Sequence, residues 1–233
     1  MKFQQSLVSG KLLRRFKRFM VDVELDSGEL ITAHCPNSGS MKSCIMPGWR
    51  VMLSQSSNPN RKYRYTWEMV HNGKCWIGIN TNIPNVITAE AISMGKIPEL
   101  RGYSTLRREI RYGVNSRIDI LLQEDLNSCY VEVKNVTLVE SDGNYYFPDA
   151  VTERGRKHLL ELTNVVESGN RAVMMFVVQR DDGNVFKPAA HIDPVYTQTL
   201  REAYEKQVEI LVYKAHVDPQ KIELTQEVNW ILS

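Results

Sequence analysis

The chain has 233 residues, of which 42% are hydrophobic and 24% are charged, and its formal net charge is +2 at pH 7. This composition excludes an intrinsically disordered chain, and no apolar run of the sequence approaches the ~20 residues that a membrane-spanning helix needs. The N-terminal stretch carries several charges and lacks an apolar core before a small-residue cleavage site, so we expect a cytoplasmic protein without a secretory signal or a membrane partner.

The charge is divided unevenly along the chain. Residues 1–83 hold 12 Lys and Arg against 5 Asp and Glu, a net charge of +7, whereas residues 84–233 hold 17 against 22, a net charge of −5. A basic part beside an acidic part is typical of a module that binds phosphates next to a module that binds metal cations. Chance asymmetry on a solvated surface gives the same totals, so the charge alone leaves both interpretations open.

Residues 12–79 consist of short apolar runs separated by turn signals. The first run, residues 12–25, is expected to form one strand that ends at the turn Asp26-Ser27-Gly28, and Asn72-Gly73 marks a later hairpin. About five strands in about 80 residues predict a small closed or partly closed barrel, with an OB-like fold as the leading candidate. We therefore expect an OB-like, nucleic-acid-binding domain over residues 1–83.

Basic and aromatic residues interleave in this predicted barrel. Cations contact backbone phosphates and aromatic rings stack on bases, which are the two contacts that bind a single strand. Strand alternation separates Tyr63, Tyr65 and Trp67 from the cations beside them, so we expect the rings to face the core. The predicted nucleic-acid contacts are therefore the basic side chains Arg14, Arg15, Lys17, Arg18, Arg61, Lys62 and Arg64.

From residue 84 onward the pattern changes to an α/β layout, which makes the chain α+β overall. Thr152 and Asp193 are suited to cap two of the predicted helices, and Gly95 and Gly169 are suited to end helices. The expected elements are a helix over residues 84–95, strands over 105–112, 117–122 and 130–136, a helix over 152–168, a strand over 171–178, a helix over 193–206 and a strand over 208–214.

The residues that carry chemistry lie on a predicted hairpin, with Asp119 on its first strand and Glu132 and Lys134 on its second. A turn centred at residues 125–126 would pair Asp119 with Glu132 and Arg117 with Lys134. Two opposed carboxylates repel each other unless a cation lies between them. Such oxygen ligands suit Mg²⁺ or Mn²⁺, and Lys134 is placed to hold the attacking water or to neutralise developing charge. An ordinary solvent-facing hairpin can carry the same Glu-Lys pair, so the short motif alone leaves both interpretations open.

Several blocks along nearly the whole chain resemble the sugar fermentation stimulation protein A family: RFKRFMVDV, HCPNSGSM, NRKYRYTWE, GYSTLRREIRYG, SRIDILL, YVEVKNVTL, FPDAVTERGRKHLLEL and AAHID. The resemblance implies an N-terminal OB-like domain and, over residues 84–233, a mixed-sheet domain similar to PD-(D/E)xK nucleases. It also implies DNA binding and a part in regulating sugar metabolism in bacteria. Within the nuclease pattern Asp119 matches the metal-binding Asp, and Glu132 and Lys134 match the ExK pair. Ile118 stands where a proline often precedes that Asp.

Three further residues are accessory candidates. Glu90, on the predicted helix before the sheet, matches the place where many such nucleases contribute an extra carboxylate. Arg154 and His158 lie early in the helix after the ExK pair, where the pattern has polar or basic residues that touch the substrate. They are four residues apart and so share one face of that helix. Each can instead be an ordinary solvated side chain.

The function predicted first is a DNA-binding protein with an Mg²⁺-dependent nuclease site. A non-cleaving, DNA-binding transcriptional regulator of sugar-utilisation genes is the second hypothesis. A phosphodiesterase that acts on small nucleotides is the third, and it would leave the basic N-terminal face without a role. The sequence leaves open whether the partner is DNA or RNA, single-stranded or double-stranded.

Overall fold

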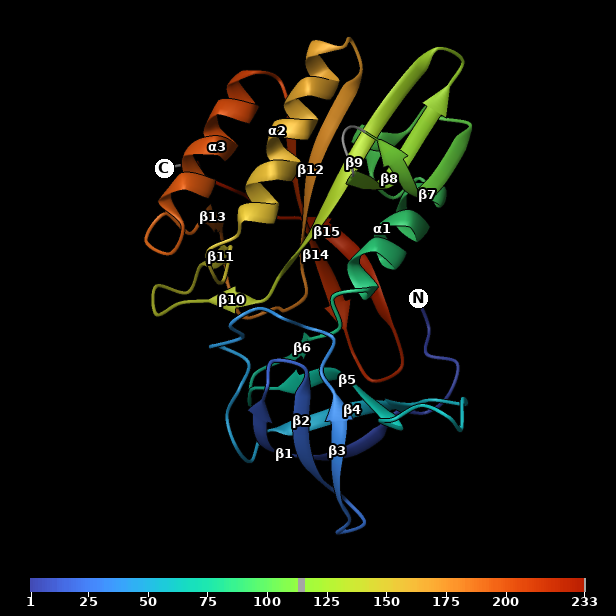
Figure 1. Cartoon of the computed structure of the whole chain (residues 1–233), viewed down its shortest axis with the longest axis vertical. Coiled ribbons are helices and arrows are strands. Elements are labelled where there is room, and N and C mark those ends of the chain that lie inside the picture. The colour runs from blue at the N-terminus through green and yellow to red at the C-terminus, as the bar shows by residue number, and fades with distance from the viewer. Residues whose placement is uncertain (113–115, 233) are drawn as a thin grey trace.

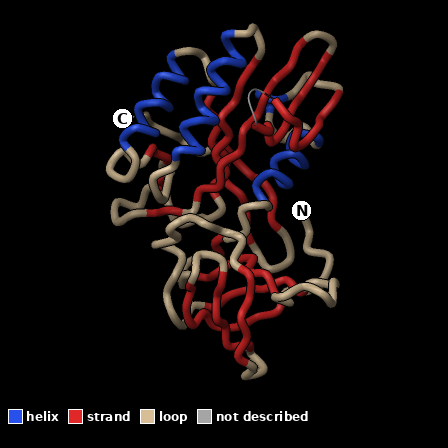
Figure 2. The backbone as a smooth tube through the Cα atoms, viewed as in Figure 1, coloured by secondary structure: helices blue, strands red, loops and turns tan. Residues whose placement is uncertain are grey.

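The computed structural model describes residues 1–112 and 116–232 of the chain (Figure 1). All helices lie in the upper part of the molecule, and the lower part consists of strands and loops (Figure 2). None of the helices in these described residues is long and apolar enough to cross a membrane. The upper part is the C-terminal domain and the lower part is the N-terminal barrel.

The N-terminal barrel is a six-stranded sheet with the order β3-β2-β1-β4-β5-β6. A parallel pairing of His34 with Thr66 joins β3 to β5, which closes five of the strands into a barrel around fully buried Leu12 and Trp67. This order and closure confirm the predicted OB-like barrel. The strands are β1 (Val8–Phe16), β2 (Met20–Leu25), β3 (Leu30–His34), β4 (Arg50–Gln55), β5 (Tyr65–His71) and β6 (Trp76–Gly78).

One turn of the barrel corrects the sequence prediction. Residues 12–25 form two strands and not one, because the chain reverses at Lys17 and Arg18, which have φ angles of 48° and 62°. No glycine or asparagine marks this turn, although such residues normally supply a positive φ. Arg15 holds the turn, since its Nε donates to the carbonyl of Arg18 at 3.1 Å and its Nη2 donates to the carbonyl of Asn37 at 2.8 Å.

The C-terminal domain is built on a second six-stranded sheet with the order β15-β14-β12-β9-β8-β7. Its central strands β9, β12 and β14 run parallel, and the outer pairings are antiparallel, so the sheet is mixed as predicted. The strands are β7 (Thr105–Tyr112), β8 (Ser116–Glu124), β9 (Asn127–Val136), β12 (Arg171–Val178), β14 (Glu209–Val217) and β15 (Ile222–Glu227).

Helices cover both faces of this sheet. Helix α1 (Ile83–Ser93) packs its apolar residues on one face, and α2 (Glu153–Glu167) and α3 (Pro194–Glu205) pack on the other. The predicted caps are confirmed, because the Thr152 hydroxyl accepts from the Gly155 N–H at 3.0 Å and the Asp193 carboxylate accepts from the Tyr196 N–H at 2.9 Å. The alternating apolar residues of the strands thus lie in two separate cores.

Short elements were not predicted, because two or three residues show no periodicity. They are η1 (Pro98–Leu100) and the small sheet of β10 (Leu138–Val139), β11 (Tyr145–Phe147) and β13 (Phe186–Pro188).

The first residues were predicted to belong to the barrel, yet the Met1 amine donates to the carbonyl of Ile222 at 2.8 Å and the Phe3 N–H donates to that of Gln220 at 3.2 Å. The N-terminus therefore pairs with the C-terminal sheet.

Arg180 joins the two domains. It is 3% exposed, and its Nη1 donates to the Ser43 hydroxyl of the barrel at 2.9 Å and to the carbonyl of Thr137 at 2.6 Å. Its Nη2 donates to Asp182, whose Oδ2 also accepts from Asn72 of the barrel at 2.6 Å. A buried ion pair that is bonded to groups of both domains fixes their contact.

Candidate active site

The β8–β9 hairpin has the register that the sequence predicts. Its two-residue turn is centred at residues 125–126, and paired residues run from Glu124 and Asn127 beside the turn to Ile120 and Val131. Extending this register by one residue would place Asp119 opposite Glu132. The two predicted metal ligands therefore lie at the end of the ladder.

The strands separate at this point, so the predicted direct pairings of Asp119 with Glu132 and of Arg117 with Lys134 are not formed. Asp119 instead reaches across the gap, where its Oδ2 accepts a hydrogen bond from the backbone N–H of Val133 at 2.8 Å. The Asp119 carboxylate thus takes the place of a β8 backbone carbonyl as the hydrogen-bond acceptor for β9. The acid is thereby attached to the residue between Glu132 and Lys134.

The gap arises because β8 changes faces at Asp119. Ile118 packs in the core under α2 and α3, whereas Ile120 packs in the core under α1, although two residues of a regular strand would share a face. The second oxygen of Asp119, Oδ1, accepts from Asn85 Nδ2 in the first turn of α1 at 2.7 Å. Sequence reasoning missed Asn85, whose only signal is a polar side chain early in the helix that precedes the sheet.

Glu132 lies at the other side of the gap and is 2% exposed. Its Oε1 accepts from Lys134 Nζ at 2.6 Å and is hydrogen-bonded to His158 Nδ1. Its Oε2 is buried and has no hydrogen-bond partner in the part of the chain that the structure describes. A buried carboxylate oxygen without a partner is costly, so this atom is suited to bind a further positive group.

Helix α2 brings His158 to this carboxylate and Arg154 to His158. Arg154 Nε lies 3.3 Å from His158 Nε2, and an arginine can only donate, so Nε2 accepts. The proton of the neutral imidazole then lies on Nδ1, where it is directed at Glu132. Lys134 Nζ lies 3.1 Å from the same Nδ1, so Lys134 and His158 both lie at Oε1 of Glu132.

The two carboxylates have opposite pKa shifts. Burial, together with the neighbouring Glu132 carboxylate, raises the pKa of Asp119 to about 6. Burial also acts against ionisation of Glu132, but Lys134 and His158 outweigh it and hold the pKa of this carboxyl below its ordinary value. Glu132 is therefore a stable anion, and the ionised form of Asp119 is disfavoured unless a cation compensates it.

The chemistry of these side chains fits a hard divalent cation. No group of three or more His, Cys, Asp or Glu with metal-binding geometry occurs among residues 1–112 and 116–232. Mg²⁺ needs only one or two protein carboxylates, because water and phosphate oxygens complete its octahedron. The free Oε2 of Glu132 and the carboxylate of Asp119 are sufficient for that requirement.

A cavity of about 410 Å³ opens beside Lys134 at the junction of the two domains. The barrel contributes Arg18 and the loop 37–39 to its wall, and the C-terminal domain contributes the end of β9 and the segment 146–152. A substrate in this cavity would contact both the strained turn of the barrel and the lysine of the ExK pair.

The N-terminal part, residues 13–79, matches the family model of the SfsA N-terminal OB domain, and residues 82–221 match that of the sugar fermentation stimulation protein RE domain. The chain belongs to the sugar fermentation stimulation protein (SfsA) family. It is 56% identical to the sugar fermentation stimulation protein homolog of Geotalea uraniireducens over 96% of both chains. It is 55% identical to the homolog of Geobacter sulfurreducens over 95% of both chains.

A solved structure of the family has the same fold. Pyrococcus furiosus SfsA in complex with Ca²⁺ superimposes with a TM-score of 0.90 at 27% sequence identity, over 99% of this chain and 98% of that chain. The fold and the family resemblance predicted from the sequence are therefore confirmed.

In this SfsA family member the predicted basic residues of the barrel have different environments. Arg14, Lys17 and Arg18 are exposed at the β1–β2 turn, and Arg14 Nε bonds to Asp22 at 2.8 Å. Arg15 is half-buried and its guanidinium bonds to backbone carbonyls, so its role in the structure is to hold the turn.

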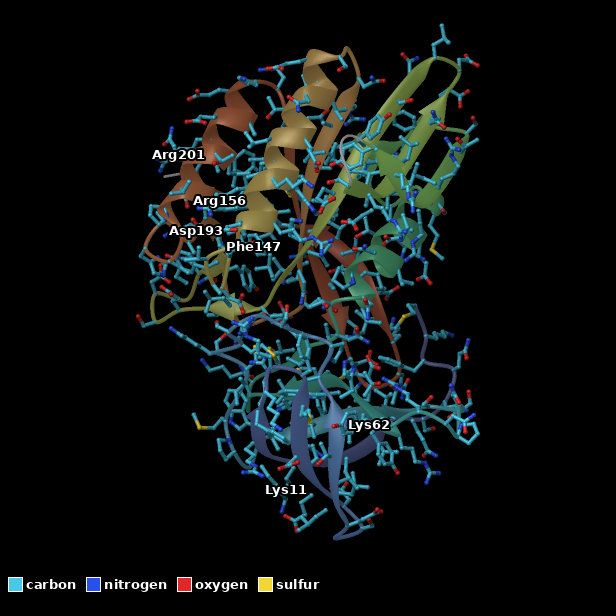
Figure 3. The ribbon with its side chains drawn as sticks, in the orientation of Figure 1. Lys11, Lys62, Phe147, Arg156, Asp193 and Arg201 are labelled. Atoms are coloured by element: carbon cyan, nitrogen blue, oxygen red, sulfur yellow. The ribbon has the colours of Figure 1, made fainter. Side chains whose placement is uncertain are left out.

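The second basic group is formed by Arg61, Lys62 and Arg64, which are exposed on the loop before β5, and Figure 3 shows Lys62 on the barrel. The Tyr63 hydroxyl lies 3.0 Å from the sulfur of Met20, so this loop lies beside the start of β2. The two basic groups thus lie near each other on the barrel. The prediction that aromatic rings face inward is confirmed for Trp67, which is fully buried, whereas Tyr63 and Tyr65 are only half-buried.

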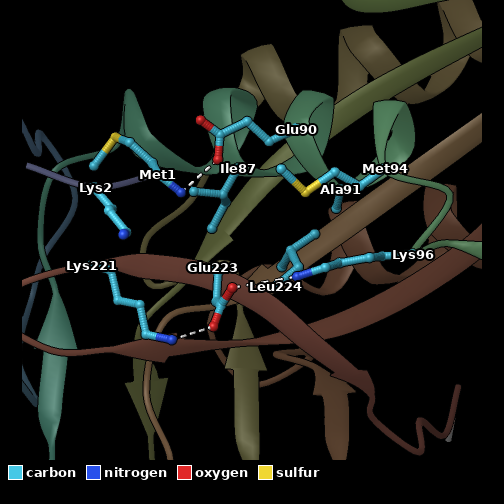
Figure 4. A pocket seen from close by; sticks show the side chains of 10 residues that line it. All are labelled: Met1, Lys2, Ile87, Glu90, Ala91, Met94, Lys96, Lys221, Glu223 and Leu224. Carbon is cyan, nitrogen blue, oxygen red and sulfur yellow. Dashed lines mark hydrogen bonds and ion pairs between the residues drawn. The ribbon is translucent and has the colours of Figure 1, made fainter.

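Glu90 does not join the site. Its carboxylate forms an ion pair with the Met1 amine at 2.5 Å and lines a different cavity, of about 380 Å³, together with Lys96 and Glu223 (Figure 4). Glu90 and Asn85 project from different sides of α1, and only Asn85 contacts Asp119.

Proposed function

We propose that this protein binds DNA and hydrolyses phosphodiester bonds at an Mg²⁺- or Mn²⁺-dependent site formed by Asp119, Glu132 and Lys134. The observation that carries the proposal is the unpartnered Oε2 of buried Glu132, beside a second carboxylate whose pKa Glu132 raises. A divalent cation between the two acids would give the free oxygen of Glu132 a partner and would offset the repulsion between the two carboxylates. The related Pyrococcus furiosus protein is in complex with Ca²⁺, a cation that also prefers oxygen ligands, which supports a divalent-cation site in this family.

Each residue of the site then has a distinct role. When bound, the cation would polarise the phosphoryl group and acidify a water molecule. Asp119 and Glu132 would hold it, and Lys134, beside the cavity, would stabilise the negative charge that develops on the phosphate. Arg154 and His158 position Glu132, and Asn85 and the Val133 N–H position Asp119.

The barrel would supply the binding of the nucleic acid. The residues predicted to contact DNA are exposed around the β1–β2 turn and the loop before β5, apart from Arg15, whose guanidinium supports the turn. Arg18 lines the same cavity as Lys134, so a strand bound on this face would lead into the proposed catalytic site. Exposed cations of this kind bind phosphates without sequence preference.

A non-cleaving DNA-binding regulator is the second candidate. The observation that favours it is that Lys134 Nζ is already engaged by Glu132, since a lysine bound in this way can serve to stabilise the fold. The family name, which concerns stimulation of sugar fermentation, agrees with a regulatory role.

One experiment separates the two candidates. Purified protein is incubated with single- and double-stranded DNA and RNA in the presence of Mg²⁺, Mn²⁺ or EDTA. A nuclease cleaves at least one substrate with metal and none with EDTA. Binding without cleavage under every condition would reject the nuclease and leave the regulator.

A further inference from the structure

The β7–β8 hairpin is the most basic segment of an otherwise acidic domain. Residues 101–117 hold five arginines and one glutamate, whereas residues 84–233 together carry a net charge of −5. Arg101 and Arg107 donate to oxygen atoms of neighbouring residues. The other three arginines are exposed, and their guanidinium groups have no hydrogen bond or ion pair within the described part of the chain: Arg108, Arg111 and Arg117.

Arg111 and Arg117 point to the same face of the sheet. They are direct partners in the ladder between β7 and β8. Their neighbours Ile110 and Ile118 pack on the side of α2 and α3, so both arginines project to the opposite side, on which α1 lies. Two positive charges therefore face each other across a pair of strands.

The third arginine and Asp119 lie on this face as well. Arg108 is the ladder partner of Ile120, which packs in the core under α1. Asp119 bonds to Asn85 of α1. Because Arg117 and Asp119 are two residues apart on β8, their Cα atoms are separated by about 6.6 Å. The basic group thus begins directly beside the proposed metal ligand.

Stability of the sheet does not explain this arrangement. Like charges directly opposite each other on neighbouring strands destabilise a sheet. Arginine on an edge strand can prevent pairing with another chain, which accounts for Arg108 and Arg111 on β7. It does not account for Arg117, because β8 is an inner strand that pairs with both β7 and β9.

We propose that Arg108, Arg111 and Arg117 form a second phosphate-binding surface, which holds the DNA backbone on the α1 face of the sheet beside Asp119. A phosphate between Arg111 and Arg117 would remove their repulsion, as guanidinium groups bind phosphate oxygens in pairs. The β7–β8 hairpin lies in the upper part of the molecule and the barrel lies in the lower part (Figure 1). DNA would then contact cations of both domains. The inference rests on the DNA-binding half of the proposed function and does not require cleavage.

The test is DNA binding in EDTA, which prevents cleavage, measured by fluorescence anisotropy over a range of salt concentrations. The variants are Arg111→Ala/Arg117→Ala, the charge-retaining Arg111→Lys/Arg117→Lys, and the control Lys206→Ala, which removes a charge from an exposed ion pair at the far end of α3. The double alanine variant should bind on the order of 10-fold more weakly. The slope of log K against log salt should fall by about 1.8 for duplex DNA or about 1.4 for a single strand. Lys206→Ala should bind like the wild type, and the lysine variant should lie between.

Thermal melting of the same variants excludes misfolding as the cause. The double alanine variant should be at least as stable as the wild type, because a like-charge repulsion is removed. If the folded double alanine variant binds DNA with the affinity and salt slope of the wild type, the proposed second surface is wrong and the role of the barrel is unaffected. If the variant is unstable and its folded fraction binds DNA like the wild type, the two arginines have a structural role instead. If the wild type binds no DNA at all, the DNA-binding half of the proposed function fails, and this inference fails with it.

Discussion

Asp119 Oδ2 accepts the backbone N–H of Val133 at 2.8 Å, so the acid of one strand is fixed to the residue between Glu132 and Lys134 on the next. This contact occurs where the ladder between β8 and β9 has ended. Burial, together with the neighbouring Glu132 carboxylate, raises the pKa of Asp119. A cation between the two carboxylates would offset their repulsion, and this relationship can be tested without measuring activity.

The first prediction concerns metal-dependent stability. Mg²⁺ or Mn²⁺ at about 100-fold over its Kd should stabilise the wild type by about 2.7 kcal/mol, because it binds only the folded state. Asp119→Asn should abolish this gain and raise the stability of the metal-free protein, since it removes a repulsion while the amide oxygen can still accept the Val133 N–H. Calorimetry measures both effects.

The control is Asp125→Asn at the tip of the same hairpin. Asp125 is exposed and has a φ of 48°, a conformation that asparagine tolerates. This variant should respond to metal like the wild type. An equal response in Asp119→Asn would place the metal elsewhere.

The second prediction concerns salt. Replacing Arg14, Lys17 and Arg18 together by alanine should weaken DNA binding and flatten its salt dependence by about 0.9 per lost phosphate contact. Lys11→Ala, an exposed residue nearer the other end of β1, is the matched control and should have a smaller effect. Adding Arg15→Ala should also lower the melting temperature, because Arg15 holds the turn. Unchanged affinity in a folded triple variant would contradict the proposed role of this turn.

The third prediction concerns the domain junction. Asp182→Ala should lower the free energy of unfolding by about 3–5 kcal/mol, because it leaves the buried charge of Arg180 without its partner. The neighbouring Asp181→Ala removes a carboxylate that is 65% exposed and should cost less than about 1 kcal/mol. Similar losses in the two variants, measured by urea unfolding, would contradict the assigned role.

The same carboxylate makes stability depend on pH. Burial opposes ionisation, but the hydrogen bonds and charge of Arg180 hold the pKa of Asp182 below its ordinary value. A carboxyl whose pKa is lower in the folded state contributes its stability above its unfolded pKa, which is about 3.9, and loses it as the pH falls through the folded value. The difference in unfolding free energy between wild type and Asp182→Asn should therefore shrink below about pH 4. A difference that stays constant down to pH 2 would contradict this account.

The hairpin could be predicted largely from the sequence, and its opening could not. Turn position and register follow from strand alternation on either side of residues 125–126, and both are confirmed. Ile118 and Ile120 read as one face of a regular strand, yet they lie in different cores. Such a change of face depends on packing between distant segments and leaves no local pattern in the sequence.

The accessory residues show the same limit. Arg154 and His158 were predicted to share a helix face, because that face is set by helical periodicity. They contact each other, and His158 contacts Glu132. Periodicity does not determine how α1 is rotated against the sheet. It therefore could not show that Asn85, and not Glu90, contacts Asp119.

The central claim, that Asp119, Glu132 and Lys134 form a nuclease site, is tested most directly by comparing cleavage by wild type, Lys134→Ala and Glu132→Gln with Mg²⁺ or Mn²⁺. Lys134→Ala should keep metal binding and DNA affinity but cleave on the order of 100- to 1,000-fold more slowly, because its charge matters chiefly in the transition state. Glu132→Gln should lose metal affinity as well. Cleavage that survives both substitutions, or that is absent with every substrate and metal, would contradict the claim.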